Sequence, residues 1–291
     1  MKLLILILLS AACFAQQVRF PVVILDRDER FIKSLNASDF HVVEDGVEQT
    51  VQGAEISTGG ISMGIVIDRS MSMRRSGLAS KDSLLRGLAS TVDQCGPGDE
   101  FFVMLFAKEA LLACDFTQDP DRLIRAFSSG DFQGRTALWD ALFETVTHLD
   151  HARNIKRAVF LISDGRDNAS QTRPADAAKS IWLRGTPIFV LNPSSYTDPG
   201  VLLSQQRDLQ QVAVKSGGWY REAVNDHNIG AYVVWIRDFL RAQYTITYTP
   251  TKPGTAGKWR NVRVKVAPQE GRKGLKVVAP SGYYFPSSPG R

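Results

Sequence analysis

Residues 61–72 read Ile61-Ser-Met-Gly-Ile-Val-Ile-Asp68-Arg-Ser70-Met-Ser72, an apolar run that ends abruptly in polar side chains. The run is rich in β-branched residues, which is typical of a strand buried on both faces of a parallel sheet. Asp68, Ser70 and Ser72 offer a carboxylate and two hydroxyls at its end, where open α/β sheets bind their ligands. These hard oxygen donors favour Mg²⁺ or Mn²⁺ over zinc or copper. The alternative interpretation is an Asx-type turn that caps the next helix.

Two segments further along the chain carry polar side chains of the same kind. Residues 134–138 (Gly-Arg-Thr-Ala-Leu) open an amphipathic helix, and residues 162–165 (Ile-Ser-Asp-Gly) end a second apolar strand predicted at 158–162. The resulting set resembles, in identity, order and spacing, the metal-ion-dependent adhesion site of the von Willebrand factor A family: Asp68, Ser70, Ser72, Thr136 and Asp164. The resemblance covers about residues 57–241.

The resemblance implies roles for these residues. Ser70, Ser72 and, in the ligand-bound state, Thr136 would contact the cation through their hydroxyls, whereas Asp68 and Asp164 would act mostly through water. Such a shell neutralises a dication poorly, so its open position favours a carboxylate from a partner. We expect Mg²⁺, with Mn²⁺ or Ca²⁺ as alternatives. Met71 stands where the family usually has glycine, which predicts a more crowded loop.

Arginines are frequent near these positions. If they face outward, they form a positive rim that would steer an acidic partner toward the cation. The alternative is a set of scattered, solvated or locally paired side chains. The arginines concerned are Arg69, Arg74, Arg75, Arg135 and Arg166.

Apolar strands and amphipathic helices alternate along the middle of the chain. This pattern predicts an α/β fold: a doubly wound, mainly parallel sheet with helices on both faces. Strands are expected at 63–67, 100–106, 111–116, 157–162, 187–191 and 218–222, and helices at 80–92, 121–127, 136–149, 175–183, 202–214 and 228–240.

The two ends of the chain are rich in strands. Residues 16–56 and 242–291 are each too short to bury a core alone, and each has strand edges to satisfy. We therefore expect them to pair into one small β domain, with residues 57–241 inserted between them. Residues 35–49 and 244–250, and 281–284 near the end, also resemble exported acidobacterial proteins of the von Willebrand factor A-related family.

The last helix of the inserted domain runs almost directly into the second β segment. Its buried face is expected to contain Ile229, Val233, Ile236 and Leu240, at spacings of four, three and four. A sliding movement of this helix would be passed on to the β domain, although a static packing helix is the simpler interpretation.

Residues 1–15 are interpreted as a secretory signal peptide. Lys2 provides the positive start and residues 3–9 the apolar core, with cleavage expected after Ala15. The alternative is a lipoprotein signal acylated at Cys13. Either signal predicts an exported protein, periplasmic or extracellular, with no transmembrane segment in the mature chain.

Removal of Cys13 leaves two cysteines, Cys95 and Cys114. In an oxidising compartment an even pair is a candidate disulfide. Two independent buried thiols are the equal alternative, because sequence does not give the separation of their Cα atoms.

Composition and missing motifs narrow the function. The 291-residue chain carries a net charge of +5 with both signs interleaved, which argues against nucleic-acid binding. His148 and His151 are three apart, but the zinc-protease motif and the serine-hydrolase elbow are absent. We expect a binding module rather than an enzyme, with a protein or cell-surface ligand that offers a carboxylate. The alternative is a structural assembly module of the cell envelope with a vestigial metal site.

Overall fold

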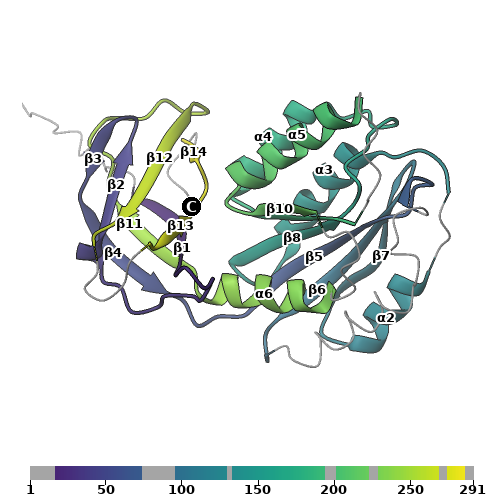
Figure 1. The fold of residues 1–291 in the computed structure, drawn as a ribbon, viewed down its shortest axis with the longest axis horizontal. Helices are drawn as coiled ribbons and strands as arrows, with labels where there is room; N and C mark the ends of the chain where they lie inside the picture. The colour runs from purple at the N-terminus through teal and green to yellow at the C-terminus, as the bar shows by residue number, and fades with distance from the viewer. Residues whose placement is uncertain are drawn as a thin grey trace, which may run out of the picture.

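A six-stranded sheet forms the centre of the larger domain in this computed structural model, which describes residues 17–73, 96–129, 133–193, 201–222, 229–268 and 274–285 (Figure 1). The strand order is β10-β9-β8-β5-β6-β7. All neighbours are parallel except β7, which pairs antiparallel with β6 at one edge. The strands are β5 (Ile61–Asp68), β6 (Glu100–Phe106), β7 (Ala110–Thr117), β8 (Lys156–Ile162), β9 (Ile188–Asn192) and β10 (Trp219–Glu222).

Helices cover both faces of this sheet, so the predicted doubly wound α/β fold is confirmed (Figure 1). One face packs against α2 (Pro120–Ser128) and α6 (Ile229–Arg241). The other packs against α3 (Leu138–His148), α4 (Pro174–Arg184) and α5 (Val201–Lys215). Among the described residues, no helix is long and apolar enough to cross a membrane.

The central strand β5 is buried along its whole length. Its side chains alternate between the two apolar cores, with Ile65 and Ile67 on the α2 and α6 side and Val66 on the other. Gly64 leaves room for a ring of the neighbouring strand, since a Cβ there would lie 2.4 Å from the Phe102 side chain. Continuous burial explains why the strand reads as an unbroken apolar run.

The two ends of the chain form one β domain, as predicted. One sheet has the order β13-β1-β11-β4 and the other β14-β12-β2-β3, so each combines strands from both ends. Their apolar side chains share a single core. The strands are β1 (Val18–Leu25), β2 (Phe40–Glu44), β3 (Val47–Gln49), β4 (Val51–Ile56), β11 (Tyr244–Tyr248), β12 (Trp259–Val266), β13 (Lys276–Val278) and β14 (Gly282–Tyr284).

The β domain is packed directly against α6. Val23 and Leu25 of β1 belong to the same apolar core as Val233, Ile236 and Leu240, so three of the four side chains expected on the buried face of this helix are buried there. The fourth, Ile229, begins the helix, but its side chain lies outside what the structure describes.

Some sequence-based boundaries differ from the structure, and some predictions fall outside its described part. The helix predicted to begin at Thr136 begins at Leu138, because Thr136 is held in a loop by the backbone and side chain of Asn168. The helix predicted at 80–92, the signal peptide at 1–15 and Cys95 lie outside the described residues. Cys114 is a buried thiol whose Sγ lies 3.3 Å from the Asp115 carbonyl oxygen. Because Cys95 is not among the described residues, its pairing with Cys114 remains a prediction.

Candidate metal site

Asp68 ends β5 and is completely buried. Its Oδ1 accepts a hydrogen bond from the Ser70 N–H at 2.8 Å, and its Oδ2 accepts one from the Ser163 hydroxyl at 2.7 Å. Burial raises the pKa of Asp68 to about 7, and the charge of Asp164 adds to this effect while the hydrogen bonds oppose it. A carboxylate so desolvated gains from a positive charge placed beside it.

The two serines that follow Asp68 have adjacent hydroxyls. Oγ of Ser70 lies 3.0 Å from Oγ of Ser72, and Ser70 is completely buried. The Ser70 N–H bond to Asp68 is the Asx-type turn considered as the alternative interpretation. That turn directs the chain so that the carboxylate and both hydroxyls share one loop, so the two interpretations are compatible.

Thr136 is brought to this loop by backbone hydrogen bonds. Gln133 N–H donates to the Arg69 carbonyl at 2.9 Å, and Met71 N–H to the Gly134 carbonyl at 3.5 Å. Thr136 itself is buried, and its N–H donates to Oδ1 of Asn168 at 2.9 Å. Residues 68–73, 133–137 and 164–170 therefore form three joined loops, called here the site loops.

Asp164 enters from the third site loop, at the end of β8, and is also buried. Its Oδ1 accepts the Arg166 N–H at 3.1 Å, and its Oδ2 lies 3.4 Å from Nε of Arg166. Because β5 and β8 are neighbouring parallel strands, Asp68 and Asp164 both lie at the carboxyl ends of the strands.

Sequence reasoning missed several residues that hold the site loops in place. Ser163 bonds Asp68 and also accepts the Gly165 N–H at 3.1 Å. Asp167 accepts the Leu138 N–H at 2.9 Å and so satisfies a free donor in the first turn of α3. The sequence could have indicated a role for Ser163 at the site, because this residue carries a hydroxyl, ends a predicted strand and directly precedes Asp164.

The donors present fit a hard divalent cation. The site loops carry two buried carboxylates and three hydroxyls, and all are oxygen ligands of the kind that Mg²⁺ and Ca²⁺ prefer. Within the described ranges there is no group of three or more His, Cys, Asp or Glu residues that would hold a metal ion by themselves. A cation here would therefore depend on the hydroxyls of Ser70, Ser72 and Thr136.

The arginines near the site loops do not all face solvent. Arg69 is buried, and its guanidinium donates to the carbonyl of Phe127 in the last turn of α2, so the expectation that it joins an exposed rim is wrong. The reason is that the last carbonyls of a helix lack intrahelical donors. Arg135 is exposed and donates to the Asn168 carbonyl, while Arg166 pairs with Asp164. Arg74 and Arg75 lie outside the described residues.

Met71 does not crowd the loop in the way its size suggested. It is 47% exposed, so its side chain extends largely into solvent. The backbone around it keeps the turn expected at this position, because Met73 N–H donates to the Ser70 carbonyl at 3.1 Å.

The structure thus combines an open α/β sheet with oxygen donors on the loops that follow its strands, which is the arrangement of an α/β domain with a candidate cation site. Residues 63–166 match the family model described as the von Willebrand factor type A domain. The chain therefore contains a von Willebrand factor type A domain, as the resemblance of the sequence predicted. No curated protein matches the chain.

Several solved structures are similar to this chain at low sequence identity. The D319A mutant of the PilB minor pilin from Streptococcus sanguinis is 12% identical, with a TM-score of 0.52 over 64% of this chain and 62% of that one. A von Willebrand factor type A protein from Catenulispora acidiphila is 15% identical, with a TM-score of 0.49 over 94% of this chain and 75% of that one. Proximal thread matrix protein 1 from the mussel byssus, with a zinc-occupied MIDAS motif, is 16% identical, with a TM-score of 0.49 over 69% and 50%.

Proposed function

We propose that this chain is an exported module that binds a partner protein or cell-surface ligand through a divalent cation, Mg²⁺ in the first instance. The observation that carries the proposal is the buried carboxylate of Asp68, which lies at the end of the central strand in the loop that also holds the hydroxyls of Ser70 and Ser72. When bound, the cation would supply a Lewis-acid position that takes an oxygen of a partner carboxylate.

The residues of the chain have separate tasks in this proposal. The Ser70 and Ser72 hydroxyls, 3.0 Å apart, would bind the ion from one loop, and Thr136 from the next. Asp68 and Asp164 would supply negative charge, with their orientation fixed by Ser163 and by the Arg166 backbone. Arg135 and Arg166, at the same edge, would favour an acidic partner over a basic one.

Binding without catalysis is part of the same proposal. A serine nucleophile needs a base within hydrogen-bond reach. The Ser70 hydroxyl lies beside the Ser72 hydroxyl, and the Ser70 N–H donates to the Asp68 carboxylate, whose other oxygen is held by Ser163. His148, among the described histidines, instead bonds Asp115 at 2.9 Å and stacks on Phe116. These contacts support a packing role for this histidine.

A structural module with a vestigial site is the second candidate. It is favoured by the pairing of Asp164 with Arg166, because this internal cation offsets a carboxylate without any bound ion. The two candidates differ in one measurable property, which is whether partner binding depends on the divalent cation.

The test uses Thr136→Ala, with Thr147→Ala as a matched control on the exposed side of α3. Thr136 is held by backbone bonds, so its variant should fold normally and lose Mg²⁺ affinity and Mg²⁺-dependent capture of partners from envelope extract. Calorimetric Mg²⁺ titration and capture with Mg²⁺ or chelator are the measurements. Wild-type capture that is equal in Mg²⁺ and chelator would select the structural module, and a Thr136→Ala variant that binds like wild type would reject the site.

A further inference from the structure

A groove lies between the two domains. It is at the amino-terminal ends of the strands of the larger sheet, whereas the site loops follow the carboxyl ends of these strands. Its volume is about 650 Å³, within the range of small-molecule sites. On one side it is lined by the end of α4 and by Ile155 and Pro187, which directly precede β8 and β9. On the other it is lined by β1, β11 and β14, and Figure 1 shows α4 facing the β domain across this junction.

The groove offers a largely apolar surface. Trp182, Tyr283 and Tyr284 contribute aromatic rings to it, and Phe20 lies buried behind it. Leu183 is 55% exposed and Ile155 95% exposed, and both line the groove beside these rings, so together they leave an apolar patch open to water. An apolar body bound here would remove this surface from water.

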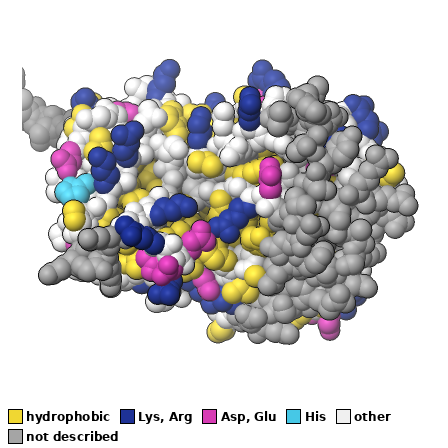
Figure 2. Space-filling model, in the orientation of Figure 1, with side chains coloured by type: hydrophobic (Ala, Val, Ile, Leu, Met, Phe, Trp, Pro, Cys, Tyr) yellow, Lys and Arg dark blue, Asp and Glu magenta, His cyan; other side chains and the backbone are white. Residues whose placement is uncertain are grey.

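The charge lining the groove is of one sign. No Asp or Glu occurs among the described residues that line it, and its four cations are Arg19, Arg157, Arg184 and Lys215. Figure 2 shows Lys, Arg and hydrophobic side chains close together on the face that it displays, with Asp and Glu side chains also present there. A site of this composition attracts an anion.

Among the described residues, three of these four cations form no ion pair with a carboxylate, and Arg184 is the exception. Arg184 pairs with Asp150 at 2.9 Å. Arg157 instead donates to the backbone carbonyls of Asn154 and Ala152, which leaves its charge in place. Nζ of Lys215 lies 5.4 Å from the centre of the Trp182 ring, so a cation and an aromatic surface are adjacent.

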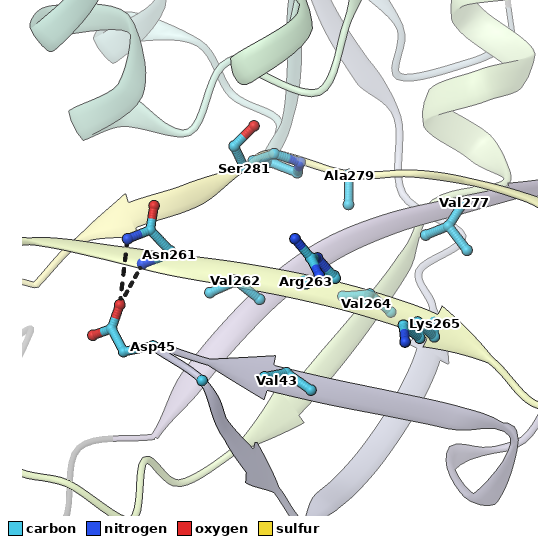
Figure 3. Close-up of a pocket in the computed structure, with 12 residues that line it drawn as sticks. Val43, Asp45, Asn261, Val262, Arg263, Val264, Lys265, Val277, Ala279 and Ser281 are labelled. Carbon is cyan, nitrogen blue, oxygen red and sulfur yellow. Dashed lines mark hydrogen bonds between the residues drawn. The ribbon is translucent and has the colours of Figure 1, made fainter.

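A second hollow, of about 570 Å³, serves as a comparison within the β domain (Figure 3). It follows β12, and its lining carries Arg263 and Lys265 together with Asp45, which accepts hydrogen bonds from Asn261 (Figure 3). Its described lining carries both signs of charge and no aromatic ring, so the interdomain groove is the stronger candidate for an amphipathic anion.

We propose that the groove between the domains is a binding site for a small amphipathic carboxylate, with its chain on the Trp182, Leu183 and Tyr283 surface and its carboxylate near Lys215 and Arg19. The site is separate from the site loops and goes beyond the proposed cation-dependent binding. Because both domains line it, the bound ligand contacts both at once.

The test compares decanoate with 1-decanol, which has the same chain length and no charge. Calorimetry should show one decanoate per chain, and intrinsic tryptophan fluorescence should change because the Trp182 ring lines the groove. The double variant Arg19→Gln, Lys215→Gln should bind decanoate about tenfold more weakly, as expected for loss of charged hydrogen bonds. Leu183→Glu, at an exposed position, should abolish binding by repulsion.

Two controls separate this site from the others. Lys108→Gln removes a cation from the turn before β7 and should leave decanoate binding unchanged. Asp68→Asn and the presence of chelator should also leave decanoate binding unchanged, because the metal site lies at the carboxyl ends of the strands, away from the groove. The proposal is overturned if wild type does not bind decanoate, if 1-decanol binds as tightly, or if the groove variants, folded by circular dichroism, bind like wild type.

Discussion

The hydroxyl of Ser163 donates a 2.7 Å hydrogen bond to Oδ2 of Asp68, across the two neighbouring parallel strands β8 and β5. The other carboxylate oxygen of Asp68 is held by the Ser70 N–H. Each oxygen of the buried carboxylate thus has a fixed partner, so its rotamer is set before any ion binds. Fixed orientation of this kind is how residues behind a metal ligand tune affinity.

Replacement of Ser163 by alanine should weaken Mg²⁺ binding about tenfold, because Asp68 loses the bond that orients it. The protein should remain folded with a loss of about 1–2 kcal/mol in the free energy of unfolding. Calorimetric titration and urea unfolding measure the two effects. Ser62→Ala is the control, since the Ser62 hydroxyl donates to Glu100 at the other end of β5 and its loss should leave Mg²⁺ affinity unchanged. Equal Mg²⁺ affinity in Ser163→Ala and wild type would contradict the role of Ser163.

The raised pKa of Asp68 predicts a pH dependence of stability in chelator. The pKa of this carboxyl is about 7 in the folded chain against 3.8 when exposed, because burial disfavours its charged form. Its contribution to stability is therefore fully present below about pH 4 and is lost as the pH rises toward 7. The total change is on the order of 4 kcal/mol, at about 1.4 kcal/mol for each pKa unit.

Asp68→Asn cannot ionise and should lose this part of the pH profile. Urea unfolding of both proteins between pH 5 and pH 8 in chelator measures the difference. If wild type and Asp68→Asn show parallel profiles over this range, the buried carboxyl is not the group that titrates.

Arg166 competes with a bound cation for Asp164. Its Nε lies 3.4 Å from the Asp164 carboxylate, and its side chain is 32% exposed. Arg166→Gln should remove this competing charge and raise Mg²⁺ affinity several-fold, since nearby like charges oppose binding in a site of low dielectric. Arg173→Gln, which breaks an exposed pair with Asp176, is the control for a change in net charge. An Mg²⁺ affinity that falls in Arg166→Gln would mean that the arginine supports the site.

Glu44 joins strands from both ends of the chain inside the β domain. Its carboxylate accepts hydrogen bonds from Tyr248 at 2.7 Å, from Tyr283 at 3.0 Å and from Arg260. Burial and the neighbouring Glu44 raise the pKa of both tyrosines above its ordinary value, so both phenols are donors. Glu44→Gln should lower the free energy of unfolding by about 3 kcal/mol, because Arg260 loses a buried counter-ion.

Urea unfolding tests this loss, with Glu48→Gln as the matched control. Glu48 is exposed on β3 and pairs with His41, so its variant should change stability by less than about 0.5 kcal/mol. Similar losses in the two variants would show that the Glu44 cluster contributes no more than a surface pair.

The sequence predicted the parts of this fold that depend on local pattern. The apolar run into Asp68 indicated the central strand, and the two short β segments at the chain ends indicated a shared domain. The burial of Arg69 could not be predicted, because it depends on where the last carbonyls of α2 lie in space. The hydrogen bond from the Thr136 N–H to Asn168 could not be predicted either. The two residues are 32 positions apart, and in the sequence each looks like a polar loop residue that could bond to water instead.

The interleaving of the chain ends in the β domain imposes an order on its assembly. The Leu35 N–H donates to the phenol oxygen of Tyr244, and these residues are 209 positions apart. As the chain is synthesised, β1, β2 and β4 emerge long before β11 and β12, which complete their sheets. Until then their apolar side chains and strand edges have no native partner, which is the condition that favours aggregation. The nascent protein must therefore be kept from collapse until its last segment has been made, and a chain that stops after α6 would leave those early strands permanently exposed.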